Sequence, residues 1–493
     1  MPFFLFFFML KAKTAVLIAA LLFLATIPLY AKDWLHDCWT KQVNPLKNNI
    51  LAMNYRESVN ELEHNLAPWQ VTAYVARGTV WSGAKSYSKQ DTLYSAPKQR
   101  TYFSITQRTT SNLLYQDYGE KKLAAATPGM HMDYIFQSAR YSPVALLTYF
   151  KEHGVSLDKE STATMALYHT TINQTVVRLA IRKRDSLLAQ VEMLSDDVLL
   201  GDISSSYTYE DYKQQDGIYY PVAIRVTKVN GKAQDQVTIL ASRIQTEAPV
   251  LLTPPPGYLL KPLPKLEPLI QVVHYSSRIH FLELKHTDDR VLIVEFDQFM
   301  LVAEAPLNSQ NGELIIREAK KIAPSKPIRY FVAGHHHPHY VGGVRPFVHR
   351  GSTILFGKDM GEYVRYLVAA PHTLHPDSLQ LKPRQLHTEE IRDKKVISDG
   401  PFEMQIFCIG KKSAHTNNYL IYYFPAEKLL FQDDSAWIPK QGSIGKASDR
   451  QAALYHAIKD LGLNVDTVVQ SWPVADYGVK TMIPFVDLEQ SMK

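Results

Sequence analysis

A proline-rich stretch in the middle of the chain is the feature that most constrains its fold. The run Thr253-Pro254-Pro255-Pro256-Gly257 is followed by three more prolines before residue 269. Proline cannot donate the backbone hydrogen bonds of a helix interior or a central strand, and such stretches form stiff, extended connectors. We therefore predict a linker over residues 253–268 that joins two separately folded domains, residues 32–252 and 269–493.

The overall composition is that of an ordinary globular protein. Of the 493 residues, 46% are hydrophobic and 21% are charged, which excludes a disordered, collagen-like or multi-span membrane protein. The net charge is +6, and it is spread without long basic runs. Because nucleic-acid binding needs a concentrated basic surface, we expect no nucleic-acid partner.

The N-terminus has the pattern of an export signal. Lys11 and Lys13 precede the uncharged stretch Thr14–Ala31, and the polar pair Lys32-Asp33 follows. This pattern predicts a signal peptide over residues 1–31 and a periplasmic or secreted protein of a bacterial cell envelope. The alternative is an uncleaved anchor, since the apolar length is enough to span a bilayer. Membrane association would then depend on this segment alone.

The chain has only two cysteines, Cys38 and Cys408. In an oxidising compartment they either pair with each other or remain as two thiols, and the sequence does not decide between these alternatives. Two cysteines are too few for a cysteine-based zinc ribbon.

The N-terminal half is rich in strand patterns. Helices are predicted over Tyr55–Asn65 and Pro143–His153, and a meander of strands follows Leu187. Asp216-Gly217 and Asn230-Gly231 lie where hairpin turns are expected. We predict a mainly antiparallel sheet with a few helices.

One part of this half has a weak resemblance to a known family. Residues Tyr207–Pro221 resemble the strand-turn-strand signature of the unclosed β-half-barrel in periplasmic lipoprotein-carrier-like domains. The resemblance implies an apolar concave surface for a lipid or peptide ligand. The alternative is a purely structural companion domain.

The C-terminal half alternates between strand and helix patterns. Ser309 can cap a helix that runs to Ile322, and the strand Ile328–Ala333 follows. The order strand-helix-strand is typical of an α/β layer.

A histidine cluster follows this strand directly. The segment Gly334-His335-His336-His337-Pro338-His339 holds four histidines within five positions. In extended backbone His335, His337 and His339 point to one side and His336 to the other. Two imidazoles on one side form a workable pair of zinc ligands, whereas the alternative is a solvated polar loop.

Here a resemblance to a second family becomes specific. The segment from His335 to Gly343 reads His-x-His-x-His-Tyr-x-Gly-Gly. It resembles the His-x-His-x-Asp-His and Gly-Gly hallmark of the metallo-β-lactamase superfamily. His415, in Ser413–Asn417, looks like the next histidine ligand, and Tyr419–Phe431 leads into Asp433-Asp434 like the strand pair before the metal-bridging aspartate. The resemblance implies a four-layered αββα domain from Leu269 onward, and so an α+β chain.

The sequence also departs from this family pattern. His339 and Tyr340 stand where the family has aspartate and histidine, and no histidine lies near Val469–Pro473, where its last ligand belongs. The resemblance therefore implies one zinc ion, with the second site lost. The metal residues implied are His335, His337, His415 and Asp434.

A catalytic role is also open to the two substituted residues. The unperturbed pKa of an imidazole suits a general base, a role open to His339, and Tyr340 can donate a hydrogen bond to a developing oxyanion. The alternative is that both are relics of a decayed site.

Three imidazoles and one open position make a sufficient catalytic zinc site. We therefore expect a hydrolase of a small ester, lactone, thioester or lactam. Two alternatives remain: a catalytically degenerate binding or structural protein of the cell envelope, and a protein with a structural metal only. Fold analogy cannot choose among them.

Overall fold

The computed structural model describes residues 32–62, 65–95, 100–108, 112–117, 120–125, 135–249 and 268–493. The predicted signal peptide and all of the predicted linker except Pro268 lie outside the described residues. Among the described helices, none is both long enough and apolar enough to cross a bilayer.

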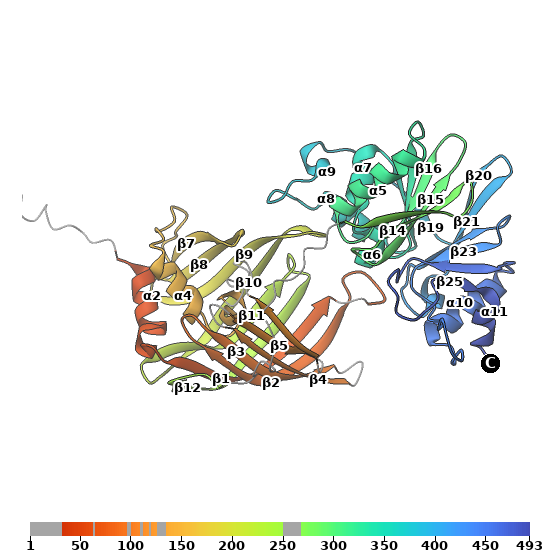
Figure 1. Ribbon diagram of the computed structural model, residues 1–493. Helices are drawn as coiled ribbons and strands as arrows, with labels where there is room; N and C mark the ends of the chain where they lie inside the picture. The colour runs from red at the N-terminus through yellow and green to blue at the C-terminus, as the bar shows by residue number, and fades with distance from the viewer. Residues whose placement is uncertain are drawn as a thin grey trace, which may run out of the picture.

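A single antiparallel sheet of 12 strands dominates the N-terminal half (Figure 1). In spatial order it runs β6-β5-β4-β3-β2-β1-β12-β11-β10-β9-β8-β7, so two meanders meet at the β1–β12 pair. The strands are β1 Ile50–Leu62, β2 Val71–Ser82, β3 Tyr87–Ser95, β4 Arg100–Arg108, β5 Asn112–Asp117, β6 Glu120–Ala125, β7 Met165–Ile172, β8 Thr175–Arg182, β9 Leu187–Asp197, β10 Gly201–Gln215, β11 Ile218–Lys228 and β12 Ala233–Gln245.

The predicted helix over Tyr55–Asn65 is wrong, because residues 55–62 belong to β1. Tyr55, Glu57 and Val59 are buried, whereas Arg56 and Ser58 are exposed. This alternation has the period of a strand. Pairing with β2 on one edge and β12 on the other overrides the local helix preference of the residues.

Helices cover one face of this sheet. They are α2 Trp34–Gln42, the short 3-10 helix η1 Asn44–Leu46 and α4 Val144–Glu152, and α4 confirms the predicted second helix. Leu35, Leu147 and Phe150 from these helices share a buried core with sheet residues such as Val177 and Ile224. Figure 1 shows the sheet curving around the helices, as expected for a half-barrel-like arrangement.

The C-terminal half contains two further sheets. The first is a mixed, seven-stranded sheet in which β16 to β19 are parallel, and the second has six strands with one parallel pair, β23–β24. The first sheet consists of β13 Ile270–His274, β14 Ile279–Leu284, β15 Asp289–Glu295, β16 Met300–Ala303, β17 Ile328–Ala333, β18 Thr353–Gly357 and β19 His387–Ile391. The second consists of β20 Lys394–Asp399, β21 Phe402–Cys408, β22 Leu420–Phe424, β23 Leu429–Gln432, β24 Thr467–Gln470 and β25 Met482–Pro484.

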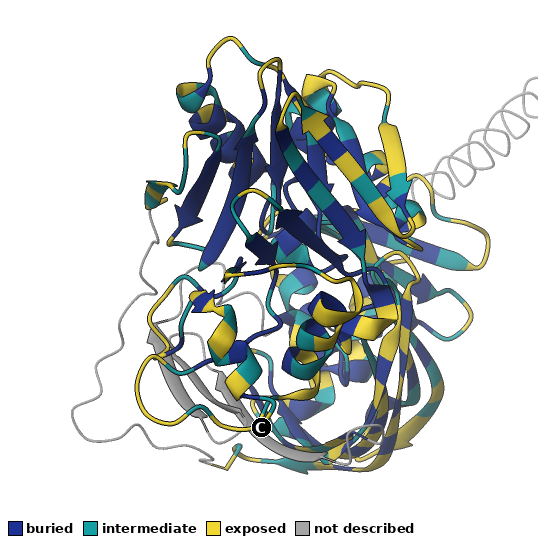
Figure 2. Cartoon of the chain, turned by 90° about the vertical axis from the view of Figure 1, so that its right-hand side faces the viewer, coloured by how far each residue is buried: buried dark blue, intermediate teal, exposed yellow. Residues whose placement is uncertain are grey.

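These two sheets form the middle of four layers. Phe281 and Leu292 of the first sheet share a core with Met404 and Phe431 of the second. A separate core joins the first sheet to helices α5, α7 and α8, and another joins the second sheet to α10 and α11. The predicted αββα arrangement is therefore confirmed, and the central strands are dark blue in Figure 2 because both of their faces are covered.

The helices of this half are α5 Ser309–Ile322, α6 Pro338–Val341, α7 Val344–Arg350, α8 Gly361–Ala369, α9 Ser378–Leu381, the 3-10 helix η2 Gly410–Ser413, α10 Asp449–Asp460 and α11 Phe485–Gln490. Helix α5 ends at Ile322 as predicted, but its cap is Asn308, whose side chain accepts a hydrogen bond from the Asn311 amide. Ser309 is the first helical residue instead.

The two cysteines are free thiols in the structure. Cys38 is buried in α2 and donates to Gln42 Oε1 over 3.2 Å, and burial raises the pKa of its thiol. Cys408 ends β21 in the other half.

Candidate metal centre

The centre begins where β17 ends and the chain bends into α6. Gly334 occupies this bend because a side chain there has no room: a Cβ atom would lie 2.3 Å from Asp433 Oδ2. The Gly342-Gly343 pair lets the end of α6 approach residues 305–307, since a Cβ on Gly342 would lie 2.4 Å from the carbonyl carbon of Leu307. Backbone packing therefore fixes where the histidine segment lies, at the carboxyl end of a parallel strand, where α/β sheets bind ligands.

Three of the predicted ligands come together. One ligand nitrogen from each of His335, His337 and His415 lies within 4.8 Å of the others. His335, His337 and His415 are 0%, 4% and 5% exposed, respectively. Nε2 of His335 lies 2.9 Å from Nδ1 of His337. Burial lowers the pKa of His335, and its two neighbours lower it further, so its neutral, metal-binding form is favoured.

The third histidine supplies a test of whether this group fits a metal ion. Nε2 of His415 is buried and has no hydrogen-bond partner among the described residues. The atom lies 3.2 Å from Asp434 Oδ2, but the contact lacks hydrogen-bond geometry. A buried nitrogen without a hydrogen bond costs free energy, and a metal ion among three imidazoles removes that cost. The donor set therefore fits zinc.

Asp433 supports the cluster from behind. Its Oδ2 lies 2.5 Å from Nδ1 of His335, so this N–H donates to the carboxylate and Nε2 keeps its lone pair for a metal. Carboxylates in this position orient histidine ligands and make them more basic. The sequence shows the Asp433-Asp434 pair, but it does not reveal the contact of Asp433 with His335, which lies 98 residues away.

Glu304 lies next to Asp433 and completes a buried pair of acids. It accepts hydrogen bonds from Tyr422 Oη over 2.6 Å and from the Gly334 amide over 3.2 Å. Burial raises the pKa of Glu304 to about 8. Burial and the charge of Glu304 likewise raise the pKa of Asp433. Such a pair holds a proton near neutral pH because two adjacent buried charges are costly.

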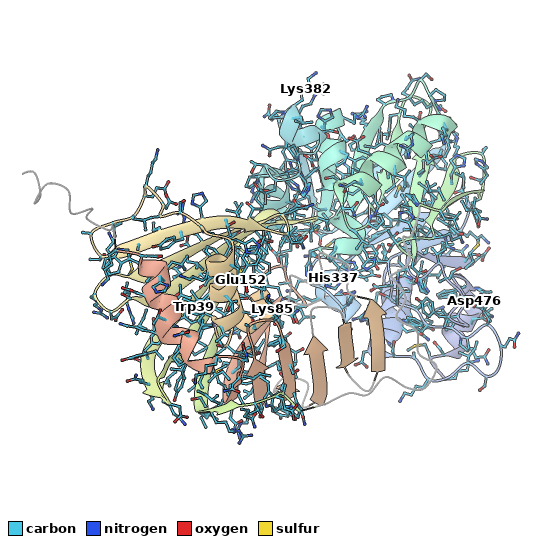
Figure 3. The ribbon with its side chains drawn as sticks, turned by 60° about the vertical axis from the view of Figure 1, so that its left-hand side comes forward. Trp39, Lys85, Glu152, His337, Lys382 and Asp476 are labelled. Atoms are coloured by element: carbon cyan, nitrogen blue, oxygen red, sulfur yellow. The ribbon has the colours of Figure 1, made fainter. Side chains whose placement is uncertain are left out.

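The N-terminal half supplies a second supporting group. The other nitrogen of His337, Nε2, donates to the carbonyl oxygen of Asn65 over 3.2 Å, which leaves Nδ1 for a metal. Figure 3 shows His337 at the junction between the two halves. A backbone carbonyl from a loop 272 residues away leaves no signal in the sequence.

His339 does not join the three histidines. Helix α6, with Pro338 at its first position, replaces the extended backbone that was expected there, and proline favours this helical start. His339 Nδ1 instead lies 2.9 Å from Oδ1 of the buried Asp289. Burial by itself lowers the pKa of His339, but the hydrogen bond and charge of Asp289 outweigh it and raise the pKa.

Tyr340 lies against the cluster as a packed ring. Its ring centroid is 4.2 Å from that of His335, and the residue is 3% exposed. Burial, followed by the nearby charges of Asp434 and Asp433, raises the pKa of its hydroxyl, so the hydroxyl stays protonated.

Asp434 lies at the edge of the cluster rather than within the three-nitrogen group. Its Oδ2 is 3.2 Å from His415 Nε2 and 3.6 Å from an Arg450 nitrogen. At the position of the family's last histidine, Ser471 donates to the Arg290 carbonyl over 2.8 Å. Among the described residues, a single group of candidate metal ligands is assembled.

A cavity of about 620 Å³ lies beside the cluster. The C-terminal half lines it with His336, His337, Pro338, Tyr363 and Arg450. The N-terminal half contributes Leu62, residues 67–70 and the pair Leu199-Leu200. The cluster therefore borders, through His337, a space between the two halves of a size that suits a small molecule.

Comparisons with known proteins give a similarity in structure alone. No protein-family profile and no curated protein matches the sequence. About half of the chain is similar in structure to metallo-β-lactamases, at low sequence identity.

Three solved structures illustrate this similarity. A metallo-β-lactamase from Pontibacter korlensis is 13% identical, with 45% of this chain and 97% of that chain covered and a TM-score of 0.33. The metallo-β-lactamase FIM-1 from Pseudomonas aeruginosa, in its mono-zinc form, is 16% identical, with 46% and 95% covered and a TM-score of 0.33. The sec-alkylsulfatase Pisa1 from Pseudomonas sp. is 11% identical, with 45% and 40% covered and a TM-score of 0.32. Likeness at this level does not carry an activity from one protein to another.

Proposed function

We propose that this protein is a metal-dependent hydrolase that uses one zinc ion held by His335, His337 and His415. The observation that carries the proposal is the buried nitrogen triad, in which His415 Nε2 has no hydrogen-bond partner among the described residues. When bound, zinc in such a site acts as a Lewis acid and brings the pKa of bound water near 7.

The chain's own residues prepare this chemistry. Asp433 and the Asn65 carbonyl hold the outer nitrogens of His335 and His337, which fixes both rings. Asp434 adds a carboxylate beside His415. The cavity next to His337 admits a small molecule, and we propose an ester, lactone, thioester or lactam as the substrate.

Elemental analysis tests the metal site. Purified wild-type protein supplied with zinc is expected to hold about one zinc per chain, and His337→Ala is expected to hold almost none. The exposed His387 on β19 provides a matched control, and His387→Ala is expected to keep the metal. Folded wild-type protein without zinc would refute the proposal.

Turnover tests the reaction. The zinc-loaded protein is expected to hydrolyse at least one class in a panel of esters, lactones, thioesters and lactams, and His337→Ala is expected to be inactive. Bound zinc with no turnover across the panel would favour a second candidate, a structural metal. The near-complete burial of all three histidines is the observation that supports this candidate.

We also propose that the protein is exported to the periplasm or beyond. The proposal rests on Lys11 and Lys13 before the uncharged stretch Thr14–Ala31. Cell fractionation and N-terminal sequencing test it. A mature N-terminus at Lys32 is expected, and a cytoplasmic protein that retains residues 1–31 would refute it.

A further inference from the structure

A loop from the N-terminal half forms one wall of the cavity beside the cluster. We call residues 65–70, between β1 and β2, the Trp69 loop. It is anchored to the other half at two points. The Asn65 carbonyl accepts from His337, and the Leu66 carbonyl accepts from the Asn417 amide over 2.7 Å. The loop therefore has a fixed position relative to the candidate metal centre.

The tryptophan of this loop is held in an unusual conformation. Its φ is 62°, a left-handed value that bulky residues rarely adopt. The ring packs edge-on against Tyr363 and Tyr366, with centroids 5.1 and 4.7 Å away, and Lys232 lies over it at 4.8 Å. Strained backbone of this kind persists where surrounding contacts enforce it, and it clusters at functional sites.

A second element of the N-terminal half extends the wall. Leu199 and Leu200 lie in the turn between β9 and β10, where Asp197 accepts hydrogen bonds from both of their amides over 2.9 and 2.8 Å. Both leucines pack against the core of the C-terminal half. The strand that follows this turn, β10, is tied to that half through Asp202, whose Oδ1 accepts from the Leu374 amide over 3.1 Å.

The chemistry of the cavity indicates what it can bind. Most of the described residues that line it are apolar, among them Trp69, Leu199 and Tyr363. Arg450 is the only lysine, arginine, aspartate or glutamate among the described residues that line it. An apolar group gains free energy by burial there, whereas a positively charged group meets a like charge.

We propose that the N-terminal half selects the substrate: Trp69 and Leu199 bind a bulky apolar acyl group that carries no positive charge. This inference rests on the proposed hydrolase function. It assigns the substrates to esters, or the corresponding thioesters, lactones and lactams, whose acyl part is medium-chain or aromatic. Trp69 and Leu199 are specificity-determining residues, and they act by contact with the part of the substrate that does not react.

Two p-nitrophenyl esters, the acetate and the octanoate, test the proposal because they share a leaving group. The zinc-loaded wild type is expected to have the higher kcat/KM for the octanoate. Trp69→Ala is expected to raise KM for the octanoate about tenfold and to leave the acetate unchanged. Leu199→Ala is expected to act in the same direction with a smaller effect. Leu240→Ala, at a 63% exposed leucine on β12, is the matched control and is expected to change neither KM.

A binding measurement separates this inference from the proposed function. Calorimetric titration of zinc-free protein with octanoate is expected to show binding that Trp69→Ala weakens about tenfold. Trp69→Phe, which keeps an aromatic ring, is expected to retain most of the binding and also serves if the alanine variant does not fold. Octanoate binding that does not change in the Trp69 and Leu199 variants would refute substrate selection by these residues. Equal losses of kcat/KM for both esters would refute it as well. No turnover of either ester, together with octanoate binding that depends on Trp69, would refute the proposed hydrolase function. It would support the binding of an apolar group by Trp69 and Leu199.

Discussion

The residues before and after Pro338, here called the first and second sides of the histidine segment, differ in the contacts that they make. On the first side, His335 and His337 turn their nitrogens toward His415, and groups behind them hold both rings in place. On the second side, His339 and Tyr340 are occupied by other partners, the buried Asp289 and the ring of His335. The first side is arranged for a metal ion, whereas the second is arranged for packing.

One helical turn accounts for this difference. Pro338 begins α6, and the helical backbone rotates His339 out of the alternating pattern that an extended chain would continue. The site therefore supports one metal ion, and each variant below tests one side against the other.

The largest loss of zinc affinity is expected when a histidine ligand of the first side is removed. His415→Ala removes the nitrogen that has no hydrogen-bond partner in the described part of the chain. A site left with two imidazoles is expected to bind zinc more than about a hundredfold more weakly. Removal of zinc with a chelator is expected to lower the melting temperature of the wild type and to leave that of His415→Ala unchanged. Equal responses of the two proteins to the chelator would contradict the assignment of His415.

A smaller loss of zinc affinity is expected when the hydrogen bond from His335 to Asp433 is weakened. Asp433→Asn keeps the size of the side chain but weakens its acceptor, so zinc affinity is expected to fall about 10-fold to 100-fold while saturation still reaches one ion per chain. Competition with a chromophoric chelator measures this change. Asp476→Asn, at an exposed aspartate, is the matched control. An unchanged affinity in Asp433→Asn would remove Asp433 from the site.

A variant of the second side is expected to change the free energy of unfolding rather than the zinc content. His339→Ala leaves the buried Asp289 without this partner, which is expected to cost about 1–3 kcal/mol of the free energy of unfolding. Zinc content is expected to stay at the wild-type value. Urea unfolding and elemental analysis measure the two quantities on the same sample. Loss of zinc in this variant would break the comparison, because it would make His339 a ligand.

The alternation of β17 and α5 and the pair His335 and His337 could be predicted because both depend on local patterns, whereas the αββα layers and His415 were implied by the family resemblance. Strand and helix periodicities predicted β17 and α5. His335 and His337 are two residues apart, so both can act as ligands in any backbone conformation that keeps them on one side. Residue partners from distant elements could not be predicted in this way. Asp433, Glu304 and the Asn65 carbonyl act through contacts that only the folded chain creates.

The same reasoning explains the two errors in local structure. The segment predicted as a helix from Tyr55 has residues that favour a helix, but neighbouring strands on both edges make residues 55–62 part of β1. His339 was expected beside His337 because the prediction assumed extended backbone up to that residue. In both places the backbone conformation was decided by packing or by a turn that the side-chain pattern did not reveal.

The smallest effect is expected at Tyr340. Tyr340→Phe removes one hydroxyl and keeps the ring that packs on His335, and Tyr340 is not among the described residues that line the cavity. We therefore expect wild-type zinc content and a loss of kcat well below the 10²–10³-fold range that is typical for removal of an oxyanion donor. Steady-state kinetics with the best ester measures this loss. A loss within that range at unchanged zinc content would show that the second side takes part in the reaction through Tyr340, and packing alone would no longer describe it.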